Sequence, residues 1–179
     1  MGLVLLTGGA RSGKSALALR LASEQGAPVV FLATARAGDE EMEARIARHR
    51  RERPGSWRTI EEHLRLREAI EGVDGGHCLI VDCLTLWTAN ALERFGAEDA
   101  EAEGGAAAAS AAARPGTTIA VTNEVGLGLV PDNPVGRSYR DLLGRVNAIW
   151  GGAAERALLL VAGRALDLER LDSPAGGLR

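Results

Sequence analysis

The chain has 179 residues, 46% of them hydrophobic, and a formal net charge of -3. This length predicts one domain, 1–179, with a single sizeable core. The charge provides no whole-chain basic surface of the kind that nucleic-acid binders show, and no apolar run reaches the roughly 18 residues of a membrane span. We therefore expect no nucleic-acid partner and no membrane span.

Short apolar runs alternate with helical patterns along the chain. This alternation is typical of an α/β fold with a mostly parallel central sheet flanked by helices. Asp39 is a suitable N-cap for the second of the helices. We expect strands at 3–6, 28–33, 78–82, 117–122 and 157–162, and helices at 14–25, 39–53, 64–72 and 142–150.

The stretch at about 96–115 differs from the rest because it consists mostly of Ala, Glu and Gly. Alanine favours a surface helix, but the glycines at 104 and 105 are expected to interrupt it. With few large apolar side chains to bury, this low-complexity segment is predicted to be a poorly packed or mobile excursion without chemistry.

The two cysteines, Cys78 and Cys83, fit no metal-binding or redox spacing. They are expected to be buried, reduced thiols. The first predicted strand starts at Leu3, which leaves no room for a signal peptide. Together these features predict a cytoplasmic protein.

The sequence GGARSGKS at 8–15 matches the phosphate-loop pattern G-x-x-x-x-G-K-[ST] and lies between a predicted strand and a predicted helix. In such a P-loop, backbone N–H groups bind phosphate, the lysine (Lys14) reaches the β- and γ-phosphates, and the hydroxyl of Ser15 binds Mg²⁺. Lys14 is the only lysine among 21 Lys and Arg residues, which indicates that a compact ammonium is needed here. We therefore expect a P-loop NTPase fold with nucleotide contacts from Gly8, Gly9, Ala10, Arg11, Ser12, Gly13, Lys14 and Ser15.

Polar residues follow two other predicted strands. Asp82 ends the strand at 78–82, where it is a candidate Mg²⁺ ligand or, alternatively, a cap for the next turn. Thr34, Ala35 and Arg36 follow the strand at 28–33, near the edge where open α/β sheets bind ligands. Arg36 is either a phosphate or base contact or an ordinary surface arginine.

The predicted helix at 39–53 is strongly basic toward its end. Its arginines suit a polyphosphate, since Arg forks bind phosphate oxygens in pairs, but a solvated basic face is an equally simple interpretation. The pattern alone gives His49 no special role. Further along, Glu124 is either a base, a group that orients one, or a structural hydrogen-bond partner.

Several motifs together resemble one family, the bifunctional adenosylcobinamide kinase / adenosylcobinamide-phosphate guanylyltransferases of cobalamin biosynthesis. The resemblance runs from residue 3 to about residue 165. The combination of the GGARSGKS loop with TNEVG is much more specific than a phosphate loop alone. The motifs are TGGARSGKS at 7–15, RIARHR at 45–50, RP at 53–54, WRTIEE at 57–62, DCLTLW at 82–87, TNEVGLGLVP at 122–131 and GRVN at 144–147.

The resemblance implies two reactions. ATP or GTP phosphorylates adenosylcobinamide, and GMP is then transferred from GTP to adenosylcobinamide phosphate, which gives adenosylcobinamide-GDP and pyrophosphate. It also implies a GMP-histidine intermediate, which in this chain falls on His49, and a homo-oligomer, with a trimer suspected. Together with the residue-based reasoning above, the candidate catalytic residues are His49, Lys14 and Glu124, and the candidate Mg²⁺ ligands are Ser15 and Asp82. It implies further nucleotide contacts from Thr34, Ala35, Arg36, Arg50, Arg51, Glu52, Arg53, Glu61, Glu62 and Asp82.

The segment 131–141, with Arg137, Tyr139 and Arg140, is a candidate for corrinoid binding or for a subunit contact. Two other functions compete with the bifunctional one. A simple P-loop small-molecule kinase needs the phosphate loop and Mg²⁺ but not His49. A nucleotide-switched binding module needs a guanine-reading N-K-x-D-type sequence, which a chain with Lys14 as its only lysine cannot contain.

Overall fold

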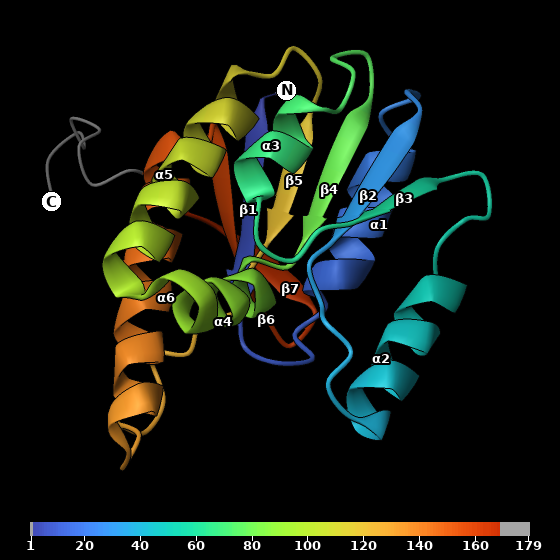
Figure 1. The fold of residues 1–179 in the computed structure, drawn as a ribbon. Coiled ribbons are helices and arrows are strands. Elements are labelled where there is room, and N and C mark those ends of the chain that lie inside the picture. The colour runs from blue at the N-terminus through green and yellow to red at the C-terminus, as the bar shows by residue number, and fades with distance from the viewer. Residues whose placement is uncertain (1, 169–179) are drawn as a thin grey trace, which may run out of the picture.

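The computed structural model describes residues 2–168, which form one seven-stranded sheet with helices on both faces (Figure 1). Six strands are parallel and the last is antiparallel to its neighbour. The spatial order of the strands is β3-β2-β4-β5-β1-β6-β7. The strands are β1 (Leu3–Gly8), β2 (Val29–Ala33), β3 (Arg58–Glu61), β4 (Cys78–Asp82), β5 (Thr118–Val121), β6 (Arg156–Val161) and β7 (Arg164–Leu168).

The helices divide unevenly between the faces of the sheet. Alternate strand residues point to opposite faces, so the chain forms two apolar clusters, one under α1 and one under α3, α4, α5 and α6. Helix α2 buries no residue in either cluster and lies beside the carboxyl ends of the parallel strands (Figure 1). The helices are α1 (Lys14–Ser23), α2 (Glu40–Arg51), α3 (Leu66–Glu71), α4 (Leu84–Phe95), α5 (Ala97–Ala113) and α6 (Pro134–Ala153).

This architecture confirms the predicted α/β class and the mostly parallel sheet. All five predicted strands and four predicted helices are present, although α6 begins at Pro134 rather than at 142, where Asn133 Oδ1 accepts a hydrogen bond from Gly136 N. The short edge strands β3 and β7 and the helix α4 were not expected. Within residues 2–168 no helix is both long and apolar enough to cross a bilayer.

The prediction that the segment 96–115 is interrupted at its glycines and poorly packed is wrong. The segment forms helix α5 without interruption, and its small residues let the helix lie close to two tryptophans supplied by its neighbours. A Cβ atom at Gly104 would lie 3.2 Å from the Trp87 ring, and the Gly104 carbonyl accepts a hydrogen bond of 3.1 Å from Trp150 Nε1. Large side chains were therefore unnecessary on α5 itself. Its buried residues are Ala100, Gly104, Ala107, Ala108 and Ala111.

Arg114, just after α5, joins several segments on one side of the sheet. Its buried guanidinium donates to the carbonyl oxygens of Ile70 (3.3 Å), Val73 (2.6 Å), Asp74 (3.2 Å) and His77 (2.9 Å). We expect Arg114→Met to lower the free energy of unfolding by about 3–5 kcal/mol. The reason is that the four buried carbonyl oxygens would lose their charged hydrogen-bond donor. Chemical denaturation followed by circular dichroism measures this loss.

The matched control is Arg67→Met on α3. Arg67 is exposed and forms a surface ion pair with Glu71 at 3.9 Å, which contributes at most about 1 kcal/mol. Equal small losses in the two variants would contradict the structural role assigned to Arg114.

Candidate functional site

The P-loop connects β1 to α1 through a backbone that only certain residues adopt easily. Gly8 and Gly13 have φ angles of 142° and 103°, and a Cβ atom at Gly8 would lie 2.3 Å from the carbonyl oxygen of Leu160. Arg11 also has a positive φ, 57°. Such alternation of backbone conformation turns successive N–H groups toward one point, where an anion binds.

Lys14 lies inside the curl of this loop. Its Nζ atom donates to the carbonyl oxygens of Gly8 (2.9 Å) and Gly9 (2.6 Å), and it lies 3.4 Å from Ser12 Oγ. Burial lowers the pKa of Lys14 below its ordinary value, and the nearby carboxylate of Asp82 acts in the opposite direction. The loop therefore holds its ammonium beside the acidic end of β4.

The P-loop is supported from both sides. Glu124 N donates to the Gly8 carbonyl (3.1 Å), and Gly163 N, in the β6–β7 turn, donates to the Ser12 carbonyl (3.1 Å). The side chain of Glu124 turns back on its own loop, where Oε1 accepts from Gly126 N at 3.0 Å. This contact supports the structural interpretation of Glu124, and its catalytic role stays a prediction.

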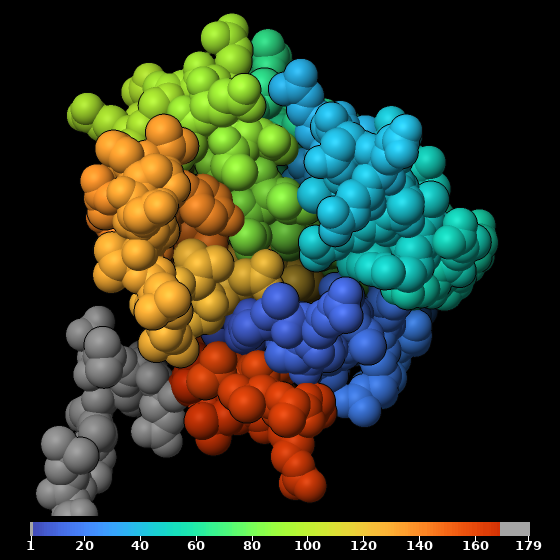
Figure 2. Space-filling view, turned by 90° about the horizontal axis from the view of Figure 1, so that it is seen from below, coloured from blue at the N-terminus to red at the C-terminus, as the bar shows by residue number. Residues whose placement is uncertain are grey.

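A cavity of about 370 Å³ lies between α2 and the carboxyl ends of β2 and β4. In Figure 2 the N-terminal part of the chain (blue), which includes the P-loop, lies between α2 (cyan) and the segment that follows β5 (gold). The P-loop follows β1 and the cavity lies at the ends of β2 and β4, so both are at one edge of the sheet. Of the predicted nucleotide contacts outside the P-loop, the cavity is lined by Ala35, Arg50, Arg53, Glu61 and Asp82. His49 lines it as well.

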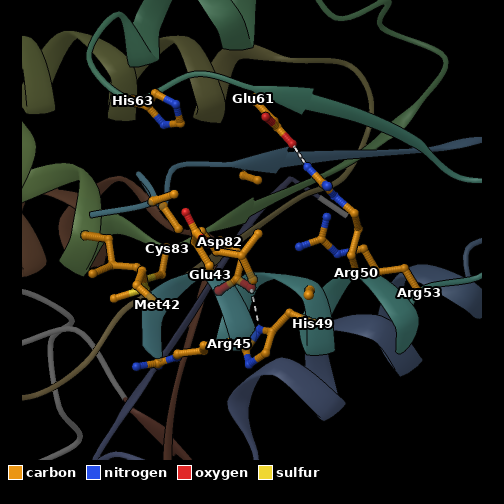
Figure 3. A pocket seen from close by; sticks show the side chains of 16 residues that line it. Met42, Glu43, Arg45, His49, Arg50, Arg53, Glu61, His63, Asp82 and Cys83 are labelled. Atoms are coloured by element: carbon orange, nitrogen blue, oxygen red, sulfur yellow. Dashed lines mark hydrogen bonds and ion pairs between the residues drawn. The ribbon is translucent and has the colours of Figure 1, made fainter. Parts of the chain in front are cut away.

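His49 and Asp82 face one another across this cavity (Figure 3). His49 Nδ1 lies 3.8 Å from Asp82 Oδ2, and both side chains are largely shielded from solvent. Helix α2 contributes the histidine and the end of β4 contributes the carboxylate. The tertiary structure therefore gives His49 a partner that the sequence pattern did not indicate.

The arginines of the basic helix are not equivalent. Arg50 pairs with Glu61 of β3 (Figure 3). Arg53 lies over the Phe31 ring with its guanidinium carbon 3.4 Å from the ring centroid, and its Nε is buried without a hydrogen-bond partner. Arg48 and Arg51 are exposed and do not line the cavity. The helix therefore combines a cavity-facing set with a solvated face.

Two predicted contacts after β2 lie elsewhere. Thr34 is fully buried, and its Oγ1 donates to the Cys83 carbonyl (2.7 Å) and accepts from Cys83 N (2.8 Å). Its side chain thus fastens β2 to the start of α4 and does not line the cavity. Arg36 lines a separate hollow with Asn90 and Arg94. The structure does not bring either side chain to the cavity beside His49.

Glu62 and Glu52 also lie outside the cavity. Glu52 is exposed, whereas Glu62 Oε1 accepts hydrogen bonds from Leu64 N (2.8 Å) and Arg65 N (3.0 Å) at the start of α3. Partial burial alone would raise the pKa of Glu62, but these backbone donors outweigh it and lower the pKa. Glu62 is therefore held as a carboxylate by the turn that precedes α3.

We expect Glu62→Gln to lower the free energy of unfolding at pH 7 by about 1 kcal/mol, since a neutral amide is a weaker acceptor for the two N–H groups. The carboxylate contributes fully above its ordinary pKa of 4.5 and loses this contribution as pH falls and Glu62 becomes protonated. The difference between variant and parent should therefore shrink toward zero at low pH. Denaturant unfolding at several pH values measures it, and a pH-independent difference would contradict the role of the Glu62 carboxylate in this turn.

Sequence reasoning assigned no role to several residues that the structure brings to the site. One side of the cavity is apolar and is formed by Met42, Ile46, Cys83 and Leu86. Arg45 also lines the cavity and adds a cation near Lys14. Cys83 is free and partly exposed, and burial raises its pKa to about 11. The spacing of Met42 and Ile46 on one helical face was the signal that could have identified the apolar side.

The motifs at 82–87, 122–131 and 144–147 meet in one hydrogen-bond network beside the P-loop. Thr122 Oγ1 donates to Asn147 Oδ1 (2.7 Å), Asn147 Nδ2 donates to the Asn123 carbonyl (3.0 Å), and Asn123 N donates to Thr85 Oγ1 (2.7 Å). These side chains fix the loop after β5 rather than line the cavity.

The side chains of 131–141 are mostly engaged within the chain. Arg137 donates to the carbonyls of Pro131 and Asp132, Tyr139 donates to the Thr85 carbonyl, and Arg140 pairs with Asp141. Within this segment Val135 is an exposed apolar side chain, and Leu127, Leu129 and Val130 are exposed just before it.

Ser15 and Asp82 are suitable in type for Mg²⁺. Within residues 2–168 no group of three or more His, Cys, Asp or Glu side chains could hold a metal by itself. Mg²⁺ in nucleotide sites is usually held by one or two protein oxygens together with phosphates and water. A hydroxyl at the start of α1 and a carboxylate at the end of β4 fit that pattern.

The comparisons with known proteins agree on one family. A family model described as cobinamide kinase / cobinamide phosphate guanyltransferase matches residues 4–168. A Pseudomonas aeruginosa protein named bifunctional adenosylcobalamin biosynthesis protein CobP is 45% identical, over 92% of this chain and 96% of its own. The Escherichia coli protein named bifunctional adenosylcobalamin biosynthesis protein CobU is 35% identical, over 90% of this chain and 96% of its own.

Solved structures support the fold alone. A KaiC-like protein from Pyrococcus horikoshii has a TM-score of 0.51 at 15% identity and covers 88% of this chain and 70% of its own. An ATPase of a bacterial type III secretion system has a TM-score of 0.53 at 14% identity, and the match covers 89% of this chain and 51% of the ATPase chain. The predicted P-loop NTPase fold is thus confirmed.

Proposed function

The chain belongs to the cobinamide kinase / cobinamide phosphate guanyltransferase family, and we propose that it catalyses both reactions on adenosylcobinamide. In the first, ATP or GTP phosphorylates the hydroxyl of adenosylcobinamide. In the second, GMP from GTP is joined to adenosylcobinamide phosphate, and pyrophosphate is released. The observation that carries the proposal is the placement of His49 and a P-loop at the same edge of one sheet.

The kinase step relies chiefly on the P-loop. Backbone N–H groups of the loop and the Lys14 ammonium hold the phosphates and stabilise the charge of the transferred group. The acceptor hydroxyl attacks the γ-phosphorus and gives up its proton to solvent, and the bond to the β-phosphate oxygen breaks. No histidine takes part in this transfer.

The guanylyl step uses His49 as a nucleophile. A lone pair of the neutral imidazole attacks the α-phosphorus of GTP, and the bond to the bridging oxygen breaks as pyrophosphate leaves. A phosphate oxygen of adenosylcobinamide phosphate then attacks the same phosphorus, and the electrons of the N–P bond return to the ring. Arg50 and Arg53 lie in the same cavity, where guanidinium groups offset the negative charge of both transition states.

We propose that Ser15 and Asp82 hold Mg²⁺, which would offset charge on the nucleotide phosphates. Asp82→Asn is expected to raise the Mg²⁺ concentration for half-maximal kinase activity on the order of tenfold, because a neutral amide is a weaker ligand for a hard cation. Kinase assays over a Mg²⁺ series measure the change. An unaltered Mg²⁺ dependence would leave Asp82 without a metal role.

The proposed function is tested by incubating the protein with α-labelled GTP in the absence of a corrinoid. We expect a label that is released by acid and retained in base, as for a phosphoramidate, and that passes to adenosylcobinamide phosphate when it is added. Kinase activity without such a label would favour the simple P-loop kinase. Slow hydrolysis without transfer to any acceptor would favour the nucleotide-switched module.

We further propose a cytoplasmic location, where ATP and GTP are supplied, and assembly into a homo-oligomer, with a trimer suggested by the family. The exposed apolar residues Leu127, Leu129 and Val130 supply surface either for a second subunit or for the corrinoid. Light scattering of the purified protein measures the number of subunits.

A further inference from the structure

Three hollows follow one another across the exposed side of α4. The first is the cavity beside His49, and the second, of about 340 Å³, shares His63 with it. The third has a volume of about 400 Å³ and shares Glu93 with the second. In Figure 2 the green region that contains α4 lies between α2 (cyan) and α6 (gold to orange). The three hollows together form one groove, called here the α4 groove.

Helix α4 forms the floor of this groove because one of its faces is turned outward. Leu86 lines the first hollow, Asn90 the second, and Glu93 both the second and the third. Residues three and four positions apart lie on the same face of a helix. From Leu86 to Glu93 the helix rises about 10 Å, at about 1.5 Å per residue. The groove therefore connects the cavity beside His49 with a surface about 10 Å away.

The second hollow is polar, and its charged groups are unpaired. Arg36, Glu93 and Arg94 are exposed and form no ion pair or hydrogen bond with other residues in the described part of the chain. Asn90 Nδ2 donates to the Thr34 carbonyl oxygen at 3.0 Å, whereas Asn90 Oδ1 has no partner among the described residues. The hollow thus presents both hydrogen-bond donors and hydrogen-bond acceptors to a ligand.

The third hollow is mainly apolar. It is lined by Ala89 and Leu92 of α4 and by Val135 and Tyr139 of α6. The side chain of Val135 is 72% exposed, so a ligand that covers it removes apolar surface from water. An apolar hollow next to a polar one suits a ligand that has a broad apolar body and polar side groups.

We propose that the α4 groove binds the acceptor corrinoid, with the macrocycle on the third hollow and its amide side chains in the second. This inference rests on the proposed function. The arm that ends in the acceptor hydroxyl then runs along α4 into the cavity beside His49. An extended chain gains roughly 1.2 Å per bond, so an amide-linked arm of about seven bonds covers most of the distance of about 10 Å.

The chemistry of the second hollow matches the amide groups of a corrinoid. Guanidinium N–H groups of Arg36 and Arg94 donate to amide carbonyl oxygens, while Glu93 and Asn90 Oδ1 accept from amide N–H groups. The second hollow also adjoins the cavity in which the acceptor must react, because His63 lines both. A ligand bound in the groove is therefore held next to the nucleotide.

The charges of the second hollow favour such a ligand over a second copy of the chain. Another subunit packed here would bury Arg36, Glu93 and Arg94, and burying charges without matching partners costs free energy. A ligand in an open groove binds these groups while they stay in contact with water. The α4 groove is thus assigned to the corrinoid rather than to a subunit contact.

Ala89→Trp tests the groove, because Ala89 is exposed and lines the third hollow, where an indole ring would occupy the space of the macrocycle. We expect the Kd of the full chain for adenosylcobinamide to rise at least about tenfold, measured by equilibrium dialysis and absorbance. The KM for adenosylcobinamide in the kinase assay should rise with it. Labelling of the protein by α-labelled GTP without a corrinoid should stay at the parental level, since the nucleotide cavity is unchanged.

A second variant and a control accompany this test. Arg94→Ala removes an exposed side chain of the second hollow and is expected to raise the same Kd roughly 2–10-fold, the cost of one hydrogen bond. Ala112→Trp is the matched control, since it places the same ring at an exposed alanine of α5 outside the three hollows. Its affinity for adenosylcobinamide should equal that of the parent.

The outcomes separate failure of this inference from failure of the proposed function. Parental corrinoid affinity in both Ala89→Trp and Arg94→Ala, in a parent that binds the corrinoid and is labelled by GTP, would overturn the groove alone. A changed number of subunits in Ala89→Trp by light scattering, with parental corrinoid affinity, would make the groove an interface between copies. A parent that neither binds adenosylcobinamide nor is labelled by GTP would overturn both.

Discussion

His49→Ala is expected to lose GMP transfer by at least about 1,000-fold while keeping a measurable part of the kinase activity. Without its nucleophile the covalent route to GMP transfer cannot proceed. Removing one charged phosphate contact instead costs about 1.5–3 kcal/mol, which lowers the rate roughly 10–150-fold. The two steps therefore respond differently in both size and selectivity. Separate assays of adenosylcobinamide phosphorylation and of label transfer from α-labelled GTP measure the two losses.

Arg48→Ala is the matched control for His49. Arg48 precedes His49 on α2 but is exposed and does not line the cavity. We expect its loss of activity to be small and similar in the two reactions. If His49→Ala showed the same small, equal losses, or if labelled GMP still formed on that variant, His49 would be a phosphate contact and not the nucleophile.

Lys14→Ala is expected to abolish both reactions, and Lys14→Arg to reduce both by several orders of magnitude. The Nζ atom fits between the carbonyls of Gly8 and Gly9 inside the loop, a space that suits an ammonium and not the larger planar guanidinium. Both reactions use phosphates held by this loop, so they should fall together. Turnover assays and calorimetric titration with GTP measure activity and binding.

Arg20→Ala on the same helix is the control for Lys14. Arg20 is exposed and forms a surface ion pair with Glu24 at 3.9 Å, so its removal should change neither reaction. Circular dichroism should show that the Lys14 variants remain folded. Near-normal kinase turnover in Lys14→Arg would show that the phosphate-loop assignment is incomplete.

The sequence was sufficient for the features that are local in the chain. The P-loop is one such feature, because its glycines, its lysine and the strand and helix around it are consecutive. The strands that form the centre of the sheet were also predicted, since a buried parallel strand is a continuous apolar run. The edge strand β3 escaped prediction because its residues RTIE are mostly exposed and carry no such run.

The segment 97–113 shows why composition alone misled. Its alanines and Gly104 lack bulk, and a sequence window cannot tell that Trp87 and Trp150 supply the bulk from other helices. Arg114 was missed for the same reason, since its carbonyl partners belong to α3 and the turn after it. Packing and satisfaction of buried polar groups are properties of pairs of segments.

The sequence by itself thus determined the fold class, the phosphate loop and the family, because each is specified by residues that are close in the chain or by motifs in order. Only the tertiary structure decided which polar side chains serve the cavity. It turned Thr34, Glu62 and Glu124 toward neighbouring backbone groups, and it placed His49 of α2 beside Asp82 of β4. The physical reason is that a hydrogen-bond partner from a distant segment is fixed only when the sheet brings the strand ends together.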